Sequence, residues 1–403
     1  MTPATRTTAA PDAPAAGALD RSALMHTYPD PPVTFVRGEG TVLWDTEGRR
    51  YLDFLGGLAV TSLGHAHPAV AEALAEQSRT LLHVSNLFGN TVGPAVAATL
   101  DRLIGGGTER AGGQVFFTNS GAEANECALK LARKWAGPGR HVVVCAQDSF
   151  HGRTLATLAA TGQPAKHAPF APMPVGFDHV PYDDIDALDA TCDPARVAAI
   201  LLEPIQGEAG VIMPSSDYLT AVRALCDDRG ILFMADEIQT GLGRTGRWFG
   251  FQHTAVMPDV ITMAKALGNG VPIGACWASA EVAAAFGPGD HGSTFGGQPL
   301  ATAAAAATLA VMESEDAPAR AARAGARLTS ALEALDGISS VRGHGLLLGA
   351  ALETARAADV VAAALAAGLV VNAPRPDTIR LAPSLLVTDD EIDEAVAILE
   401  TVL

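Results

Sequence analysis

The chain has 403 residues, of which 48% are hydrophobic and 18% charged, so bulk disorder is excluded and one large α/β unit or two lobes are expected. A formal net charge of −17 argues against nucleic-acid binding and against a basic membrane-binding surface. The five cysteines are scattered and form no CxxC pair, which favours buried free thiols in a reducing cytoplasm over disulfides or a zinc site. We therefore expect no bound metal.

The N-terminal part of the chain begins with a stretch that does not predict folded structure. Residues 1–20 are rich in Ala, Pro and Thr and lack the apolar segment of a signal peptide, so we expect a disordered tail. Residues 33–53 then show strand and turn patterns, followed by a loop with His65 and His67. Because no acidic or cysteine partner is near in sequence, we interpret both histidines as loop-packing residues. We assign residues 21–75 to a segment that joins a smaller domain.

The central part of the chain alternates short apolar runs with helical patterns, which indicates a mainly parallel sheet covered by helices on both faces. We assign residues 76–298 to this large domain. The predicted strands cover residues 114–118, 141–145, 197–202, 231–235 and 260–264. The predicted helices cover residues 68–82, 92–103, 123–135 and 218–229.

The pattern changes near residue 299. Long alanine-rich helices over about 299–335 suit the high helix propensity of alanine. They precede short predicted strands at residues 338–342, 346–352, 369–372 and 378–381, and a last helix at 389–402. This order predicts a compact α+β domain over residues 299–403.

Polar residues follow one predicted strand after another in the large domain. Ligands of parallel sheets bind beyond the carboxyl ends of the strands. The residues at these ends are Ser120, Phe150, Arg153, Glu203, Glu208, Asp236 and Lys265. Their recurrence at one edge predicts a single active site.

Lys265 and Asp236 define the chemistry expected at that edge. A lysine that follows a buried strand loses hydration, which lowers its pKa and supplies the neutral amine that a Schiff base needs. A carboxylate such as Asp236 can keep a pyridine nitrogen protonated. Taken alone, the lysine is more typical of a solvated charge and the aspartate of a helix N-cap. Gln239 is a candidate hydrogen-bond partner for the oxygen on such a ring, and Glu237 is a candidate salt-bridge residue.

The remaining candidates are weaker when each is taken alone. The turn at residues 120–122 suits a phosphate group but resembles many strand-to-helix turns. Phe150 is a candidate for stacking on a ring, although most phenylalanines belong to a core. Arg153 suits capture of a carboxylate, and Arg380 with Glu208 forms a second possible pair. Each arginine is equally consistent with a surface charge.

Six segments together resemble the class III, fold-type I, pyridoxal-phosphate aminotransferases, and the similarity extends from residue 28 to the C-terminus. Within this family the motifs are most similar to those of acetylornithine aminotransferases. The segments are FFTNSGAEANECALKLARK (116–134), SFHGRTLATLAATGQ (149–163), LLEPIQGEAGV (201–211), FMADEIQTGLGRTG (233–246), PDVITMAKALGNGVPIGA (258–275) and HGSTFGGQPL (291–300). The resemblance implies a large domain with a mainly parallel seven-stranded sheet and a smaller α+β domain.

The resemblance also implies the roles of residues that bind pyridoxal 5′-phosphate. Lys265 forms the Schiff base and moves the proton, while Asp236 pairs with the ring nitrogen. The other implied cofactor-binding residues are Ser120, Gly121 and Ala122 at the phosphate, Phe150 and Ile238 on the two ring faces, Gln239 at the ring oxygen, and Thr294 from a neighbouring subunit. A homodimer with shared active sites is implied as well.

The implied reaction is a ping-pong transfer in arginine biosynthesis. The δ-amino group of N2-acetyl-L-ornithine passes to 2-oxoglutarate, giving N-acetylglutamate 5-semialdehyde and L-glutamate. Arg153 binds the carboxylate of acetylornithine with Ser293 nearby, and Arg380 binds that of glutamate or 2-oxoglutarate. Glu208 pairs with Arg380 when the other substrate is bound.

Other substrates and one other enzyme class stay open. Ornithine, succinyldiaminopimelate and other ω-amino acids are alternative donors, and an aminomutase that uses the same cofactor is a further alternative. Leu58 stands where ornithine aminotransferases carry a tyrosine, which favours an acetylated amine over ornithine.

Overall fold

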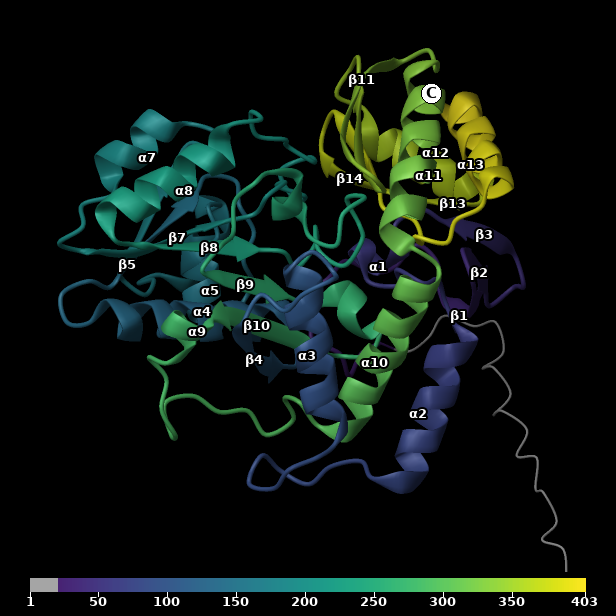
Figure 1. Cartoon of the computed structure of the whole chain (residues 1–403). Helices are drawn as coiled ribbons and strands as arrows, with labels where there is room; N and C mark the ends of the chain where they lie inside the picture. Colours follow the sequence, from purple (N-terminus) through teal and green to yellow (C-terminus); the bar gives the residue numbers. More distant parts are fainter. Residues whose placement is uncertain (1–20) are drawn as a thin grey trace, which may run out of the picture.

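The computed structural model describes residues 21–403, which form two lobes built on three sheets (Figure 1). The expected disordered tail, residues 1–20, lies outside the described residues. The large sheet has seven strands in the order β4-β10-β9-β8-β7-β5-β6, which confirms the expected fold class. Its strands are β4 (Gly113–Thr118), β5 (Val142–Ala146), β6 (Phe177–Val180), β7 (Val197–Leu202), β8 (Leu232–Asp236), β9 (Val260–Met263) and β10 (Gly274–Ser279).

The inner strands are buried on both faces, which explains why they appear in the sequence as continuous apolar runs. In β7, Ala199 and Leu201 face helix α4 (Gly121–Ala136). Their neighbours Ile200 and Leu202 face the opposite layer. That layer consists of α7 (Ile185–Thr191) and α8 (Tyr218–Arg229), and Figure 1 shows the sheet between the two layers.

Strand direction brings the expected site residues to one edge of this sheet. β5, β6, β7, β8 and β9 pair in parallel, whereas β10 is antiparallel to both β9 and β4. The carboxyl ends of β4, β5, β7, β8 and β9 therefore point the same way. The residues that follow these ends converge although they are far apart in sequence.

Two four-stranded sheets form the rest of the strand structure. One contains β1 (Phe35–Glu39), β2 (Val42–Asp45), β3 (Arg50–Asp53) and β13 (Leu369–Val370). The other contains β11 (Ile338–His344), β12 (Leu347–Leu352), β15 (Thr378–Leu381) and β14 (Asn372–Arg375). The parallel pairing of β3 with β13 joins the N-terminal segment to the C-terminal part of the chain. The domain boundaries themselves stay a prediction.

The strand predicted at residues 369–372 is wrong as a single element. Val370 pairs with Asp53 in one sheet, whereas Asn372 pairs with Arg380 in another. The chain thus changes sheets at Val371, which is buried between them. Hydrophobicity alone shows a continuous run from Leu369 to Val371, which hides the change of sheet at the last of these residues.

The long helices connect and cover the two lobes. α10 packs against α2 and α3 and leads into α11, as Figure 1 shows. The long helices outside the sheet layers are α2 (Pro68–Thr80), α3 (Val92–Ile104), α10 (Pro299–Ser314), α11 (Ala317–Glu333), α12 (Ala357–Ala367) and α13 (Asp389–Val402). The short helices are α1 (Gly56–Ala59), α5 (Leu155–Ala160), α6 (Pro164–His167), η1 (Ala168–Phe170), η2 (Gly250–His253), η3 (Lys265–Gly268) and α9 (Ala280–Ala283).

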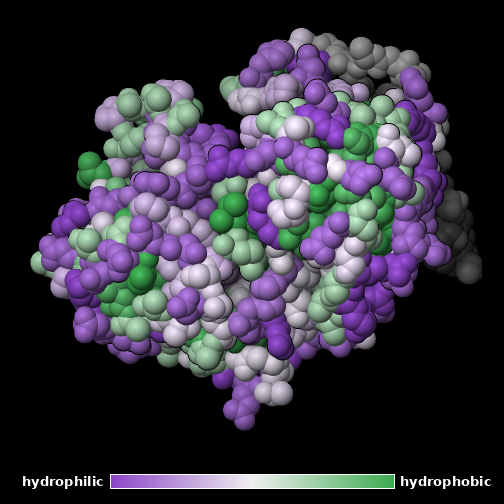
Figure 2. Space-filling model, turned by 90° about the horizontal axis from the view of Figure 1, so that it is seen from above, coloured by the Kyte–Doolittle hydropathy of each residue, from purple (hydrophilic) through white to green (hydrophobic). Residues whose placement is uncertain are grey.

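The surface seen from above is mainly hydrophilic. Figure 2 shows a face on which hydrophilic side chains predominate and hydrophobic ones form separate patches. Within residues 21–403, no helix is both long and apolar enough to span a bilayer. All five cysteines are buried and unpaired, as expected from their positions in the sequence.

Asp101 joins helix α3 to two strands of the large sheet. Its buried carboxylate accepts hydrogen bonds from Gly113 N and Trp277 Nε1, both at 2.8 Å, and from Arg110 Nε at 2.6 Å. Burial opposes ionisation, but the hydrogen bonds from Trp277, Gly113 and Arg110 outweigh it, so the pKa of Asp101 lies below its ordinary value.

We predict that Asp101→Ala lowers the free energy of unfolding by about 2 to 4 kcal/mol, because two buried N–H donors lose their acceptor. Chemical denaturation measures this change, and Asp336→Ala, at an exposed position, is the control. A lowered folded-state pKa contributes stability above the unfolded pKa that is lost as the pH falls. The difference in the free energy of unfolding between Asp101→Ala and wild type should therefore become smaller as the pH falls below 3.8, the ordinary aspartate pKa. A difference unchanged by acid would contradict this account.

Candidate active site

A cavity of about 390 Å³ lies at the carboxyl edge of the large sheet. The structure brings most of the predicted site residues together around it. These are Ser120, Gly121, Ala122, Phe150, Arg153, Glu208, Asp236, Ile238, Gln239 and Lys265. Residues from five strand ends thus surround one space of a size typical for a small-molecule site.

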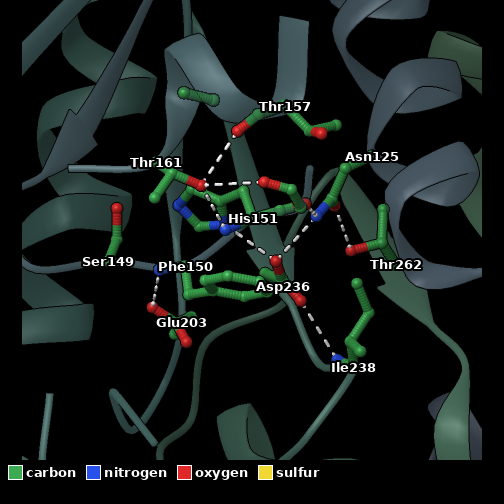
Figure 3. A network of polar contacts seen from close by, with 12 residues as sticks. Asn125, Ser149, Phe150, His151, Thr157, Thr161, Glu203, Asp236, Ile238 and Thr262 are labelled. Atoms are coloured by element: carbon green, nitrogen blue, oxygen red, sulfur yellow. Dashed lines mark hydrogen bonds and ion pairs between the residues drawn. The ribbon is translucent and has the colours of Figure 1, made fainter. Parts of the chain in front are cut away.

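Asp236 is the most tightly held carboxylate on this cavity. It ends β8 and is 3% exposed. Its Oδ2 lies 2.7 Å from His151 Nδ1 and accepts a hydrogen bond from Asn125 Nδ2 at 2.8 Å, while Oδ1 accepts one from Ile238 N at 3.1 Å (Figure 3). The carboxylate therefore has a fixed orientation at the cavity wall.

Lys265 lies at the start of η3, directly after β9. Its backbone has a φ of 43°, a left-handed conformation that a residue with a side chain adopts at some cost. Burial lowers the pKa of its ammonium group, and the positive charge of Arg380 lowers it further. The negative charges of nearby carboxylates raise this pKa, but the net shift is downward. The amine is therefore easier to obtain in its neutral, nucleophilic form than that of a surface lysine.

The turn before helix α4 combines an N-cap with a close approach to Ile238. Ser120 Oγ accepts a hydrogen bond from Glu123 N at 3.2 Å and so caps the helix. The first N–H groups of a helix have no partner within it, so those of Gly121 and Ala122 are available to an anion. A Cβ atom at position 121 would lie 2.7 Å from Ile238 Cδ1, which explains the glycine.

Glu203 contributes a second buried carboxyl group to the cavity wall. Its Oε2 accepts a hydrogen bond from Phe150 N at 3.1 Å, which fixes the turn that carries the phenylalanine. Burial, reinforced by the negative charge of Asp236, raises the pKa of Glu203 well above its ordinary value. Of these two neighbouring carboxyl groups, Asp236 is the one that several hydrogen-bond donors surround.

Arg380 is buried behind Glu208 and Gln239. Its Nη1 donates to Glu208 Oε1 at 2.7 Å and lies 3.3 Å from Gln239 Oε1, and its Nε donates to Asn372 at 3.1 Å. The remaining nitrogen, Nη2, is buried and has no hydrogen-bond partner among the described residues. Burial raises the pKa of Glu208 but Arg380 lowers it more, so the net shift is downward.

Some predicted site residues lie elsewhere. Arg153 is on the cavity but exposed, with its guanidinium 5.6 Å from the centre of the Phe150 ring. Ser293 lines a neighbouring cavity, where its hydroxyl accepts a hydrogen bond from Asn119 Nδ2 at 3.2 Å. Thr294 is exposed and borders neither space, and Leu58 is 39% exposed and does not line the main cavity.

Comparison with known proteins places this geometry in a family. The family model described as aminotransferase class-III matches residues 24–403. The chain belongs to the class-III aminotransferases. Acetylornithine aminotransferase of Corynebacterium efficiens is 50% identical to this chain over 94% of each protein, and that of Mycobacterium tuberculosis is 49% identical over 95% of this chain and 94% of its own. The ornithine aminotransferase structure from Toxoplasma gondii is 36% identical, with a TM-score of 0.89, and covers 95% of this chain and 93% of its own.

The cofactor of this class-III aminotransferase is pyridoxal 5′-phosphate. Three features of the structure fit that group. The buried carboxylate of Asp236 suits a ring nitrogen, the helix N-terminus at Gly121 suits a phosphate, and the lysine amine of Lys265 suits an aldehyde. The side chains of Phe150 and Ile238 provide apolar walls between these polar groups.

Sequence reasoning missed the residues that hold Asp236. Asn125 and His151 are 111 and 85 residues away from it in the sequence, so only the fold shows these contacts. The position of His151 next to Phe150 was the available signal. The salt-bridge interpretation of Glu237 is wrong, because its carboxylate accepts from Gly250 N and Phe251 N, both at 2.8 Å.

The histidine pair in the N-terminal loop also differs from expectation. An acidic partner is present, since His65 Nε2 lies 2.7 Å from Asp53 Oδ2. The two residues are 12 positions apart and meet because the loop folds back toward β3. Within residues 21–403, no group of three or more His, Cys, Asp or Glu side chains is arranged to hold a metal ion.

We predict that Lys265→Ala lowers turnover by more than about 10³-fold, because a positioned acid–base group alone contributes about 10²- to 10⁴-fold and the covalent anchor is lost as well. Steady-state transamination with L-glutamate and a keto acid measures this. Lys134→Ala, which removes an exposed lysine on α4, should keep wild-type turnover. Unimpaired transamination by the Lys265 variant would contradict the assignment.

Proposed function

We propose that this class-III aminotransferase transfers the δ-amino group of N2-acetyl-L-ornithine to 2-oxoglutarate, giving N-acetylglutamate 5-semialdehyde and L-glutamate in a ping-pong reaction of arginine biosynthesis. The observation that carries the proposal is a pair of arginines at different depths, with Arg153 exposed on the cavity wall and Arg380 buried behind two residues of that wall, Glu208 and Gln239. The relatives at 49–50% identity that bear the name acetylornithine aminotransferase support the same substrate.

The residues that hold the cofactor follow from the cavity. The amides of Gly121 and Ala122 and the hydroxyl of Ser120 bind the phosphate at the start of α4. Phe150 and Ile238 contact the two ring faces. The bound cofactor supplies an electron sink for the carbanion that forms when a proton leaves the substrate.

Three side chains would contact the polar groups of the ring, namely Asp236 at the end of β8, Gln239 just after it, and Lys265. Asp236 and Gln239 line the cavity, where Asp236 would accept a hydrogen bond from a protonated ring nitrogen and Gln239 would contact the ring oxygen. Lys265 Nζ is the amine that would hold the aldehyde group of the cofactor in the resting enzyme. As a neutral amine, the same nitrogen would take a proton from the substrate carbon and give it back during the transfer.

Arg153 and Arg380 distinguish the two substrates by how far the carboxylate lies from the reacting group of each molecule. Arg153, with Ser293 nearby, binds the carboxylate of acetylornithine, whose amino group is at the far end of the molecule. Arg380 binds the α-carboxylate of glutamate or 2-oxoglutarate, whose reacting carbon is adjacent to that carboxylate. Nη2 of Arg380, buried without a partner, gains an acceptor when this carboxylate arrives.

Glu208 controls which arginine is available. While it is bonded to Arg380 at 2.7 Å, the positive charge of Arg380 is neutralised and the acetylornithine carboxylate is directed to Arg153. When glutamate or 2-oxoglutarate binds, Glu208 moves aside and Arg380 forms the substrate ion pair. One cavity thereby accepts two donors whose amino groups have different positions.

We also propose a homodimer in which Thr294 of one subunit completes the phosphate site of the other. Thr294 is exposed and does not border its own cavity. Large apolar side chains in nearby segments are exposed as well, with Phe295 at 64%, Phe88 at 71% and Leu87 at 86%. A second copy that covers them would bury this surface. Five unpaired cysteines support a cytoplasmic location for the enzyme.

The substrate assignment predicts that kcat/KM for N2-acetyl-L-ornithine exceeds that for L-ornithine and for N-succinyl-L,L-diaminopimelate by at least about tenfold, or 1.4 kcal/mol. The comparison uses the purified holoenzyme with 2-oxoglutarate as acceptor. A tenfold preference for ornithine would contradict the proposal and would match the Toxoplasma gondii relative. Intramolecular amino transfer without an acceptor would indicate an aminomutase instead.

We predict that Glu208→Gln shifts the ratio of kcat/KM for glutamate to that for acetylornithine toward glutamate by about 10- to 100-fold, the equivalent of one charged hydrogen bond. The reason is that Arg380 is then no longer neutralised when acetylornithine binds. The kcat/KM value for each amino donor is measured from its half-reaction, followed by the absorbance of the cofactor. Glu281→Gln, at an exposed position on α9, is the matched control. An unchanged ratio in the Glu208 variant would rule out the switch.

A further inference from the structure

We propose that His151 is a positioning residue for the cofactor, which holds Asp236 as a carboxylate with one oxygen directed at the ring nitrogen. His151 follows Phe150 in the turn after β5, and its side chain lies behind Asp236 within the protein (Figure 3). The His151 Nδ1 atom is 2.7 Å from Asp236 Oδ2, and both side chains are buried.

The distribution of donors around Asp236 defines which oxygen is available to the cavity. Oδ2 accepts two hydrogen bonds, one from His151 Nδ1 and one from Asn125 Nδ2. Oδ1 accepts only one, from Ile238 N at 3.1 Å. An ionised carboxylate has about four acceptor positions, two on each oxygen. The open position is therefore on Oδ1, and Asp236 borders the cavity.

The tautomer of His151 follows from its two nitrogens. Nδ1 faces a carboxylate oxygen and must carry a proton to bond to it. Nε2 is buried and has no hydrogen-bond partner within residues 21–403, so a proton there would be a buried donor without an acceptor. The imidazole is therefore neutral, with its single proton on Nδ1. It orients Asp236 without neutralising it, which leaves the full negative charge for a pyridinium.

The imidazole is itself fixed by contacts to its backbone. His151 N donates to Thr161 Oγ1 at 2.9 Å, and His151 O accepts from Asn125 Nδ2 at 2.7 Å. Asn125 Oδ1 in turn accepts from Thr262 Oγ1 at 2.7 Å, which fixes the orientation of that amide. The same turn thus places Phe150 at the cavity and His151 behind the carboxylate, with little freedom for either.

The test compares three substitutions of His151 in the holoenzyme. In asparagine, the amide nitrogen is attached to Cγ, as Nδ1 is in histidine, so His151→Asn keeps a donor near the same place. His151→Gln has the same amide one bond farther away, and His151→Leu has no donor. The readouts are the pH titration of the visible absorption of the bound cofactor, the dissociation constant of pyridoxal phosphate, and kcat and KM with L-glutamate.

We expect His151→Asn to stay close to wild type in all readouts. His151→Gln and His151→Leu should lower kcat about 10- to 100-fold, the range found when the partner that orients a functional ligand is removed, with KM for glutamate unchanged. In both variants the pH titration of the cofactor spectrum should shift, because a misplaced Asp236 no longer holds the ring nitrogen protonated. His253→Gln, a substitution at an exposed histidine remote from the cavity, is the control and should shift nothing.

The proposal is overturned if the glutamine and asparagine variants behave alike, or if the leucine variant retains the wild-type spectrum and kcat. Thermal unfolding of each protein shows which variants are folded. Should the leucine variant fail to fold, the two amide variants still decide the question, since they differ only in the place of the donor. The cofactor spectrum does not depend on the amino donor. A failed prediction here is therefore distinguishable from a wrong substrate assignment.

Discussion

The buried carboxylate of Asp236 is the constraint on which the site depends. A charge at a position only 3% exposed requires compensation, and the fold provides three hydrogen-bond donors for it. Among residues 21–403, no arginine or lysine forms an ion pair with it. The negative charge is thus oriented but not neutralised, which is the condition for holding a pyridine ring in its cationic form.

Two of the carboxyl groups at the cavity, those of Asp236 and Glu203, have different hydrogen-bond surroundings. Asp236 is surrounded by donors, whereas Glu203 receives one backbone hydrogen bond and has a raised pKa, caused first by burial and then by the charge of Asp236. Lys265 is close enough to these carboxyl groups and to Arg380 for their charges to act on it, and burial lowers its pKa. A proton acceptor, a fixed anion and a second buried carboxyl group are therefore available within one small space.

Sequence patterns were sufficient for the strands and for the residues that directly follow them. The runs at 197–202 and 231–235 give β7 and β8 within one residue, because strands buried on both faces show continuous hydrophobicity. They were insufficient for β10, which is antiparallel between β4 and β9, and for the sheet change at Val371. His151 and Asn125 were missed as partners of Asp236 because such contacts depend on how separate strands and helices pack. The roles of Ser293 and Thr294 stay predictions, since neither borders the main cavity.

The central claim is that Asp236 keeps the ring nitrogen of the cofactor protonated. The most direct measurement is the 15N chemical shift of pyridoxal phosphate labelled at the ring nitrogen and bound to the resting enzyme, recorded at a pH where the free pyridine is neutral. The account predicts the shift of a protonated nitrogen, with a change to the neutral value in Asp236→Asn. A neutral ring nitrogen in the wild-type enzyme would contradict it.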